Sequence, residues 1–244
     1  MRQSDACIRI RLDADSEESA ELAVYPAAEP CGRAVVLCPG GGFNLVAFEE
    51  EGEAFVPWFR ERGMTCAVLC YRMPHGVAAR PLEDVRAALD CMRGHAREWG
   101  SAVVGVLGAS IGGHIAASAA TLLGEEERPA FQILLYPVIS MLDELAHRPS
   151  RGRMMGDEPD RALQERYSLE RQVTAGVPPA FIVLAEDDPV VSPLHALHYY
   201  EALYTAGVPV SLHVYPQGGH SFAIRESFPY RDLWLAELDR FLKG

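Results

Sequence analysis

The stretch Ala102-Val103-Val104-Gly105-Val106-Leu107-Gly108-Ala109-Ser110-Ile111-Gly112-Gly113-His114 decides the fold of this chain. Its first half is a continuous apolar run that predicts a buried strand, and the small residues after it predict a helix up to about residue 123. A serine at a strand-to-helix turn needs glycine neighbours, because the sharp turn that exposes the hydroxyl leaves no space for bulky side chains. The pattern therefore predicts a nucleophile at Ser110, with a glycine-rich packing turn as the alternative.

Two later apolar runs, each predicted to be a strand, end at residues that can activate a serine. The first leads into Asp187 and Asp188, and the second leads through a Gly-Gly turn to His220. Taken alone, such a histidine is typical of a solvated loop, and adjacent aspartates are typical of a helix cap or an exposed turn. Together they match a charge relay in which Ser110 attacks, His220 takes its proton and Asp187 orients the imidazole. We expect Asp188 to cap the turn.

A glycine loop, Pro39-Gly40-Gly41-Gly42-Phe43, follows another apolar run. Glycines let the backbone approach a ligand closely, as an oxyanion hole requires. We expect the N–H groups of Gly41, Gly42 and Ile111 to face the oxyanion. A flexible turn or a phosphate-binding loop is the alternative, but no Lys-Ser/Thr pair follows the glycines and no GxGxxG spacing is present.

The order of elements predicts an α/β fold, with a mostly parallel sheet of about eight strands and helices on both faces. Residues 7–12 and 21–25 are expected to form an antiparallel edge of this sheet. We expect residues 1–244 to form a single domain, in which about residues 138–177 form a small cap insertion. The remaining expected strands are 34–38, 66–71, 102–107, 131–136, 180–184 and 210–215.

The cap carries three arginines, Arg148, Arg151 and Arg153. They are suited to clamp a carboxylate or the oxygens of a sugar, and a solvated cationic patch is the alternative interpretation. Their role stays open at the level of sequence.

Three other side chains near these motifs are candidates for substrate binding, namely Phe43, Arg72 and His114. Arg72 has an alternative role, because its fork of donors can tie loops together. His114 and the pair His195 and His198 do not form a ligand set with any carboxylate or cysteine at a matching spacing, so no metal is expected. No other cofactor is expected either.

The charge balance bears on partners. A formal net charge of −12 argues against nucleic acid and anionic lipid, which would be repelled on average, and favours a neutral small-molecule substrate. The N-terminus lacks the apolar core of a secretion signal, and no apolar run approaches a membrane span, so we expect a cytoplasmic protein without membrane contact. The six cysteines are expected to be free thiols, mostly buried. Whether the chain forms a homo-oligomer stays open.

The chain resembles the α/β-hydrolase superfamily and, within it, the acetyl xylan esterase-like carbohydrate esterases, which are related to prolyl oligopeptidase-type hydrolases. The resemblance covers nearly the whole chain. Relatives usually carry Ala after the nucleophile, so we expect the branched side chain of Ile111 to narrow the acyl pocket. The motifs that carry the resemblance are Cys38 to Phe43, Cys70-Tyr71-Arg72, Pro81 to Ala88, Gly108 to His114, Pro178 to Phe181, Asp187 to Val191 and Tyr215 to Phe222.

This resemblance implies a serine esterase that hydrolyses small carboxylic esters through an acyl-enzyme. It points to acetylated sugars or xylo-oligosaccharides as substrates. One alternative is a peptidase or amidase of the prolyl oligopeptidase-like or arylformamidase-like type. The other is a hydrolase-fold protein that binds a ligand without turnover, although such a protein would have no need of the serine, its base, its acid and the glycine loop together.

Overall fold

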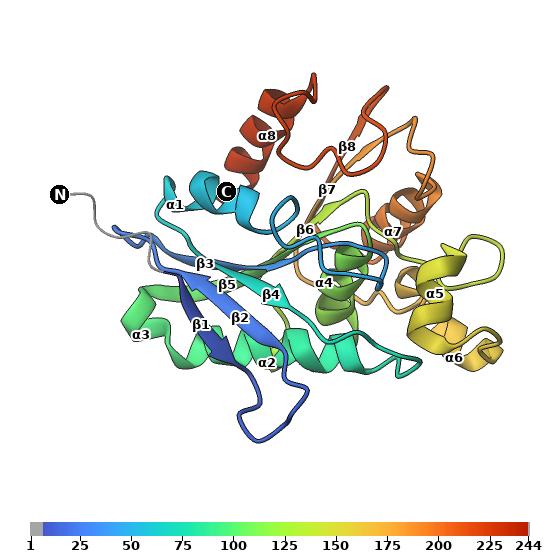
Figure 1. Ribbon diagram of the computed structural model, residues 1–244. Helices are drawn as coiled ribbons and strands as arrows, with labels where there is room; N and C mark the ends of the chain where they lie inside the picture. The colour runs from blue at the N-terminus through green and yellow to red at the C-terminus, as the bar shows by residue number, and fades with distance from the viewer. Residues whose placement is uncertain (1–6, 244) are drawn as a thin grey trace.

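An eight-stranded sheet with helices on both faces forms the centre of the computed structural model, which describes residues 7–243 (Figure 1). The strand order is β1-β2-β4-β3-β5-β6-β7-β8. β2 pairs antiparallel with both β1 and β4, and the other neighbours pair in parallel, which confirms the predicted sheet and its antiparallel edge. The strands are β1 Ile8–Arg11, β2 Glu21–Tyr25, β3 Gly32–Cys38, β4 Thr65–Cys70, β5 Ser101–Ala109, β6 Gln132–Leu135, β7 Ala180–Ala185 and β8 Val210–Tyr215.

The topology brings the predicted functional segments to one edge of the sheet. β3 lies beside β5, so the glycine loop after β3 and the serine turn after β5 are neighbours. β7 lies beside β8, so the acidic turn and the histidine loop are neighbours as well. Because parallel strands end at the same edge, all four segments lie where ligands bind in open α/β sheets.

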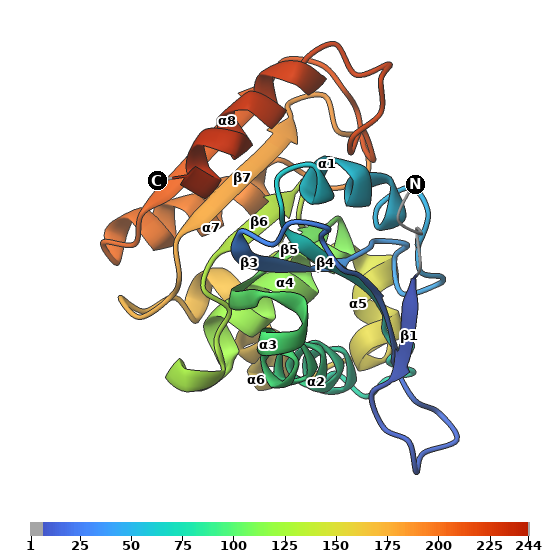
Figure 2. The same cartoon turned by 90° about the vertical axis from the view of Figure 1, so that its left-hand side faces the viewer.

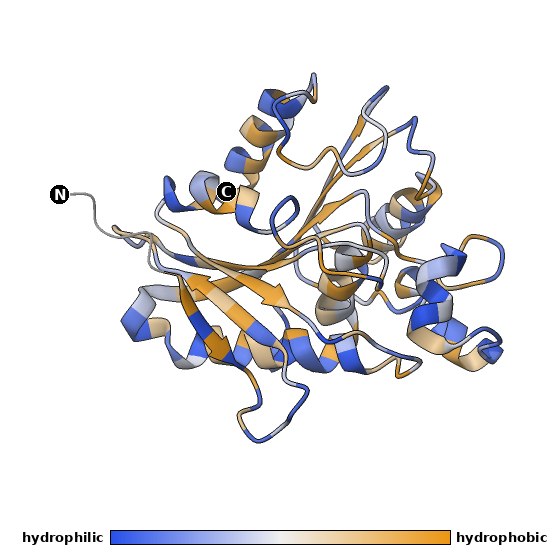
Figure 3. Ribbon diagram, in the orientation of Figure 1, coloured by the Kyte–Doolittle hydropathy of each residue, from blue (hydrophilic) through white to orange (hydrophobic). Residues whose placement is uncertain are grey.

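Helices cover the two faces of the sheet in separate groups. Helices α1 (Val56–Arg60) and α8 (Arg231–Lys243) lie over one face, and a second group of helices lies over the opposite face (Figure 2). This second group consists of α2 (Arg80–Gly94), α3 (Ala96–Trp99), α4 (Ile111–Leu122) and α7 (Leu194–Thr205). The covered strands are hydrophobic along their length, as expected for a sheet buried on both sides (Figure 3).

Short helices form the long connection between β6 and β7. They are α5 (Arg148–Met155), α6 (Arg161–Arg166) and the 3₁₀ turn η3 (Leu169–Arg171). Helix α5 reaches the loops that follow β3 and β4, because Arg153 Nη1 donates to Gly42 O at 3.3 Å and the Arg153 carbonyl accepts from Gly76 N at 3.0 Å. This segment, which Figure 1 shows at the right-hand end of the sheet, therefore borders the glycine loop. The other 3₁₀ turns are η1 (Glu53–Phe55) and η2 (Glu125–Glu127).

All six cysteines are free thiols, and they are only partly in the core. Cys38 and Cys66 are buried, and burial raises the pKa of both thiols, whereas Cys31 is exposed. Among residues 7–243, no helix has the length and apolar content needed to cross a membrane.

Candidate active site

Ser110 stands at the strained turn between β5 and α4. Its φ is 54° and its ψ is −121°, a backbone conformation that non-glycine residues rarely adopt. Glycine is required on both sides of this turn. A Cβ on Gly108 would lie 2.1 Å from Gly112 O, and a Cβ on Gly112 would lie 1.9 Å from Cys38 O. The turn therefore holds the serine in one orientation, as the sequence predicts.

A chain of hydrogen bonds leads from the serine hydroxyl through His220 to Asp188. Ser110 Oγ lies 2.9 Å from His220 Nε2, and His220 Nδ1 lies 2.6 Å from Asp188 Oδ2. The other carboxylate oxygen, Asp188 Oδ1, accepts from Val190 N at 2.8 Å and from Val191 N at 3.0 Å. The Asp188 carboxylate is thus fixed on both sides, and it orients the imidazole toward the serine.

The expectation that Asp187 contacts the histidine is wrong. Asp187 is exposed, and its Oδ1 instead accepts from Gly219 N at 2.7 Å. The expectation that Asp188 caps the turn holds only for its second oxygen. The two residues are adjacent on a turn with no helical or strand periodicity, so the sequence contains no signal that tells the inward side chain from the outward one.

Asp188 is ionised in this setting. Burial acts to raise its pKa, but hydrogen bonds from His220, Val191 and Val190 outweigh burial and hold the pKa below its ordinary value. The Asp188 side chain is 1% exposed, so water does not compete for the carboxylate oxygen that faces His220. A buried, ionised carboxylate is suited to stabilise an imidazolium.

The expected oxyanion donors lie in the loop after β3 and at the start of α4. Among the residues that the structure describes, the N–H groups of Gly41 and Gly42 have no hydrogen-bond acceptor. Ile111 is the first residue of α4, so its N–H has no partner within the helix. Gly41 has a φ of 117°, and a Cβ there would lie 2.2 Å from Leu45 O, so this loop needs glycine.

Two of the candidates for substrate binding are buried, and the third forms an ion pair within the protein. Phe43 is 3% exposed and packs edge-on against Tyr71, and His114 is 1% exposed. Neither side chain reaches a substrate without rearrangement, because both are enclosed by the core. Arg72 donates to Asp84 Oδ1 from Nε at 2.8 Å and from Nη2 at 2.6 Å, which is the loop-tying role given above as its alternative.

The side chain of Ile111 does not shape an open acyl pocket either. It is fully buried within the hydrophobic core. A branched residue is compatible with this position because its side chain packs in the hydrophobic core. The expectation of a pocket narrowed by Ile111 is therefore wrong.

The arginines of the cap have three different environments. Arg151 is buried and pairs with Asp143 at 2.6 Å, so it stabilises the connection between β6 and β7. Arg153 is exposed and donates to Gly42 O, whereas Arg148 is exposed at the start of α5. The three side chains therefore do not form one clamp, and only Arg153 contacts the glycine loop.

His147, which sequence analysis did not single out, also faces the site. Burial lowers its pKa, and electrostatic interactions with His220 and Arg153 act in the same direction, whereas the interaction with Asp188 acts to raise it. Its Nδ1 lies 2.8 Å from Ser150 Oγ. The only sequence signal for this residue was its place in the polar cap segment.

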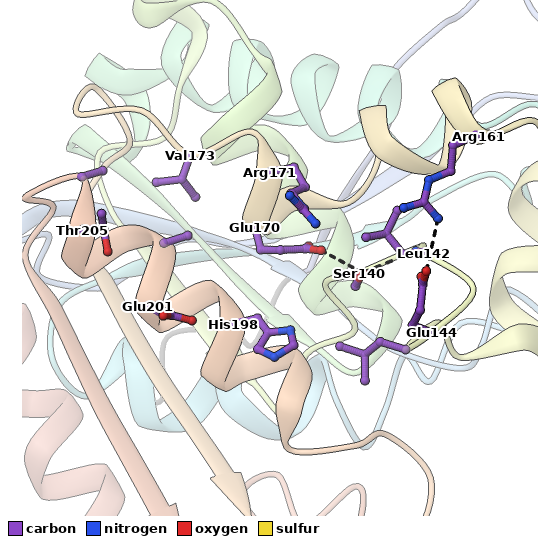
Figure 4. A pocket seen from close by; sticks show the side chains of 13 residues that line it. Ser140, Leu142, Glu144, Arg161, Glu170, Arg171, Val173, His198, Glu201 and Thr205 are labelled. Atoms are coloured by element: carbon purple, nitrogen blue, oxygen red, sulfur yellow. Dashed lines mark hydrogen bonds and ion pairs between the residues drawn. The ribbon is translucent and has the colours of Figure 1, made fainter.

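A surface cavity of about 760 Å³ opens elsewhere, between α7 and the segment around η3 (Figure 4). Ser140 Oγ donates to Glu170 Oε1 at 2.8 Å beside it, and His198 and Glu201 of α7 line its opposite wall. Neither the serine, histidine and aspartate described above nor the glycine loop lines this cavity. The candidate active site at Ser110 is therefore separate from this cavity.

Comparison with known proteins identifies the family. The model of the alpha/beta hydrolase fold family matches residues 35–224. The chain belongs to this family. The resemblance inferred from sequence is thereby confirmed at the level of the superfamily, and the matched residues include Ser110, Asp188 and His220.

Two relatives have names that refer to xylan. The chain is 34% identical over 250 residues to an acetylxylan esterase of Xylanibacter ruminicola, and 30% identical over 208 residues to endo-1,4-beta-xylanase B of Butyrivibrio fibrisolvens. These matches cover 99% and 78% of this chain but 52% and 32% of the two relatives, so the chain spans about half or less of their length.

A solved structure is similar over almost the whole chain. It is the acetyl ester-xyloside bifunctional hydrolase from Caldicellulosiruptor lactoaceticus, with a TM-score of 0.90 and 27% sequence identity. The match covers 97% of this chain and 95% of that chain. The fold of the protein is therefore that of an α/β hydrolase.

Proposed function

We propose that the protein is a serine esterase that removes acetyl groups from sugars or short xylo-oligosaccharides. The observation that carries the proposal is the hydrogen-bonded series Ser110, His220 and Asp188 beside the unpartnered N–H groups of the glycine loop. A nucleophile, a base, an orienting acid and oxyanion donors together are what ester hydrolysis through an acyl-enzyme requires.

In the first half of the proposed reaction, His220 Nε2 takes the proton of Ser110 Oγ while this oxygen attacks the ester carbonyl carbon. The carbonyl oxygen becomes an oxyanion that accepts hydrogen bonds from Gly41, Gly42 and Ile111. The imidazolium then gives its proton to the departing sugar oxygen, the ester bond breaks, and acetyl remains on Ser110.

In the second half, water loses a proton to His220 and attacks the acetyl carbonyl carbon. The same N–H groups bind the second oxyanion, and Ser110 Oγ recovers a proton as acetate leaves. Asp188 stays ionised throughout and stabilises the imidazolium in both halves. No metal or organic cofactor enters these steps.

The acetyl-sugar substrate rests on the relatives and not on a contact within the site. The acetylxylan esterase shares 34% identity with this chain, and the acetyl ester-xyloside hydrolase shares its fold at a TM-score of 0.90. Both names refer to acetyl esters or acetylated xylan. Activity on a peptide or amide bond is the competing proposal within the same family.

One panel of substrates tests both proposals. Release of acetate from acetylated xylo-oligosaccharides is followed by NMR, beside hydrolysis of aminoacyl 4-nitroanilides. We expect acetate release that Ser110→Ala abolishes and no comparable amide cleavage. A kcat/KM for an aminoacyl anilide above that for the acetylated sugar would replace the esterase with a peptidase or amidase.

A further inference from the structure

Glu51 is a buried carboxylate that the proposed reaction does not use. It is 3% exposed, and both of its oxygens accept hydrogen bonds from buried donors. Glu51 Oε2 accepts from Gly40 N at 2.9 Å, and Oε1 accepts from the Tyr136 hydroxyl at 2.9 Å. Burying a carboxylate is costly unless such donors satisfy it, so its place between these two partners calls for an explanation.

The first partner belongs to the loop of expected oxyanion donors. The Gly40 carbonyl accepts from Ala47 N at 3.0 Å and from the Tyr71 hydroxyl at 3.2 Å. Because the peptide bond is planar and trans, fixing this carbonyl directs the N–H of Gly41 to the opposite side. Glu51 holds the preceding peptide by the Gly40 N–H, so the position of Gly40 is determined from both sides.

Gly40 also lies between the carboxylate and the nucleophile. A Cβ built on Gly40 would lie 2.4 Å from Glu51 Oε2 and 3.0 Å from Ser110 Cβ. A shift of the Gly40 backbone away from Glu51 would therefore change the distance between the glycine loop and the serine.

The second partner of Glu51 packs against the histidine. The ring centroids of Tyr136 and His220 lie 4.8 Å apart with an interplanar angle of 62°. Tyr136 is itself tied to β7, since its N–H donates to Val183 O at 2.8 Å. Glu51 thus links the loop that carries the oxyanion donors to the aromatic ring against which the base rests.

We propose that Glu51 is a positioning residue, which sets the glycine loop at the distance from Ser110 and His220 that the reaction needs. The proposal rests on the esterase function proposed above. Glu51 acts through Gly40 and Tyr136 and does not contact the ester. Its effect belongs to the transition state, because the oxyanion forms only after attack and the ground-state ester needs these donors less.

Three variants separate positioning from packing. Glu51→Ala removes both links. Glu51→Gln is nearly isosteric and keeps the first link, because its amide oxygen accepts from Gly40 N. It keeps the second link with the direction reversed, because its NH₂ group donates to the Tyr136 oxygen, whereas the Tyr136 hydroxyl donates to Glu51 in the wild type. Tyr136→Phe removes one link and keeps the ring that packs against His220. Each is assayed with 4-nitrophenyl acetate, with rates expressed per active site as titrated with a fluorophosphonate.

We expect Glu51→Ala to lower kcat about 10- to 100-fold and to leave KM within about threefold of the wild-type value. This fall in kcat is smaller than the one that complete loss of an oxyanion donor causes. Glu51→Gln is expected to remain within about threefold of the wild type in kcat. A kcat per titrated site for Glu51→Ala within about twofold of wild type would overturn the proposal, because a purely structural role lowers the folded fraction and not the rate of each folded site.

Three further outcomes are decisive. If Glu51→Ala does not fold, Tyr136→Phe tests the proposal in its place. We expect its kcat to fall about 3- to 10-fold, and an unchanged kcat would overturn the proposal. A Glu51→Gln variant as slow as Glu51→Ala would also overturn it, since geometry would then not be what matters. Absence of both ester turnover and fluorophosphonate labelling in the wild type would instead refute the esterase function itself.

Discussion

Asp188 Oδ2 lies 2.6 Å from His220 Nδ1, and the adjacent Asp187 accepts from Gly219 N at 2.7 Å. Neighbouring carboxylates thus hold the same loop in two ways. Asp188 contacts the imidazole itself, and Asp187 contacts the backbone of the residue before it. Only the first contact bears directly on the orientation of the ring.

The two acids are expected to differ in their effect on turnover. Asp188→Asn should lower kcat about 10³- to 10⁴-fold, because an amide at this position favours the wrong imidazole tautomer and no longer stabilises the imidazolium. Asp187→Asn, the matched control, keeps an oxygen that accepts from Gly219 N and should cost less than about tenfold. Steady-state kinetics with 4-nitrophenyl acetate checks both. Equal losses, or a larger loss for Asp187→Asn, would show that contact with the ring does not decide the role.

The sequence was sufficient for the residues whose backbone setting is unusual. Ser110 and the glycines around it carry a signal, because the turn between β5 and α4 tolerates few other residues. His220 was found because it follows a strand and a Gly-Gly turn. The choice between Asp187 and Asp188 depends on how a short irregular turn folds back on His220, and no local pattern records this.

Side-chain burial was the other limit of sequence analysis. Phe43, Ile111 and His114 lie within the functional motifs, yet the fold buries all three, with Phe43 packed against Tyr71 and His114 against Tyr167. The sequence also gives no sign that Glu51 is buried. It stands in an acidic run that is typical of an exposed surface, and only the tertiary structure brings it to Gly40.

Ile111 is expected to contribute to stability and not to acyl selectivity. Ile111→Ala should reduce the free energy of unfolding by about 2–5 kcal/mol, the usual cost of emptying a buried site. Ile8→Ala is the control, because Ile8 is 38% exposed and should cost less. Denaturant unfolding measures both.

The same variant tests the acyl pocket. The ratio of kcat/KM for acetyl and octanoyl 4-nitrophenyl esters should stay within about threefold of wild type in Ile111→Ala, because the side chain presents no open surface. A marked gain on the octanoyl ester would show that Ile111 does limit the acyl group after all.

Two buried histidines make stability depend on pH. Burial lowers the pKa of His114 to about 3 and that of His195 to about 4, from 6.5 for a free side chain. Between the unfolded and folded values the unfolded state binds more protons, so stability is full above about pH 6.5 and falls as the pH decreases toward 4. Each histidine contributes a slope of about 1.4 kcal/mol per pH unit within this window.

Substitution of single histidines tests which of them causes this dependence of unfolding free energy on pH. Between pH 6 and pH 5, the unfolding free energy should fall by about 1.4 kcal/mol less in His114→Leu than in the wild type. The variant should therefore show about half of the fall that the two histidines cause together. His75→Gln changes an exposed histidine and should leave the profile unchanged. Urea unfolding at each pH measures the effect, and a profile of His114→Leu that equals the wild type would exclude His114 as a source of the slope.

The fold was predictable because the strands are long apolar runs and the helices between them are amphipathic. The eight expected strands appear with boundaries that differ by a few residues at most, such as β5, which begins at Ser101 and extends to Ala109. The strand order was less accessible. The position of β3 between β4 and β5 results from crossover connections that periodicity does not encode.

The most direct test of the central claim is to trap the acyl-enzyme. The protein is mixed with 4-nitrophenyl acetate, quenched in acid within the first turnover, digested and analysed by mass spectrometry. If Ser110 is the nucleophile, the wild type will carry an acetyl group on Ser110, whereas Ser110→Ala will show neither an acetyl group at this position nor significant turnover. Acetate release by Ser110→Ala at the wild-type rate, with no acetylated Ser110 in the wild type, would contradict this role of Ser110.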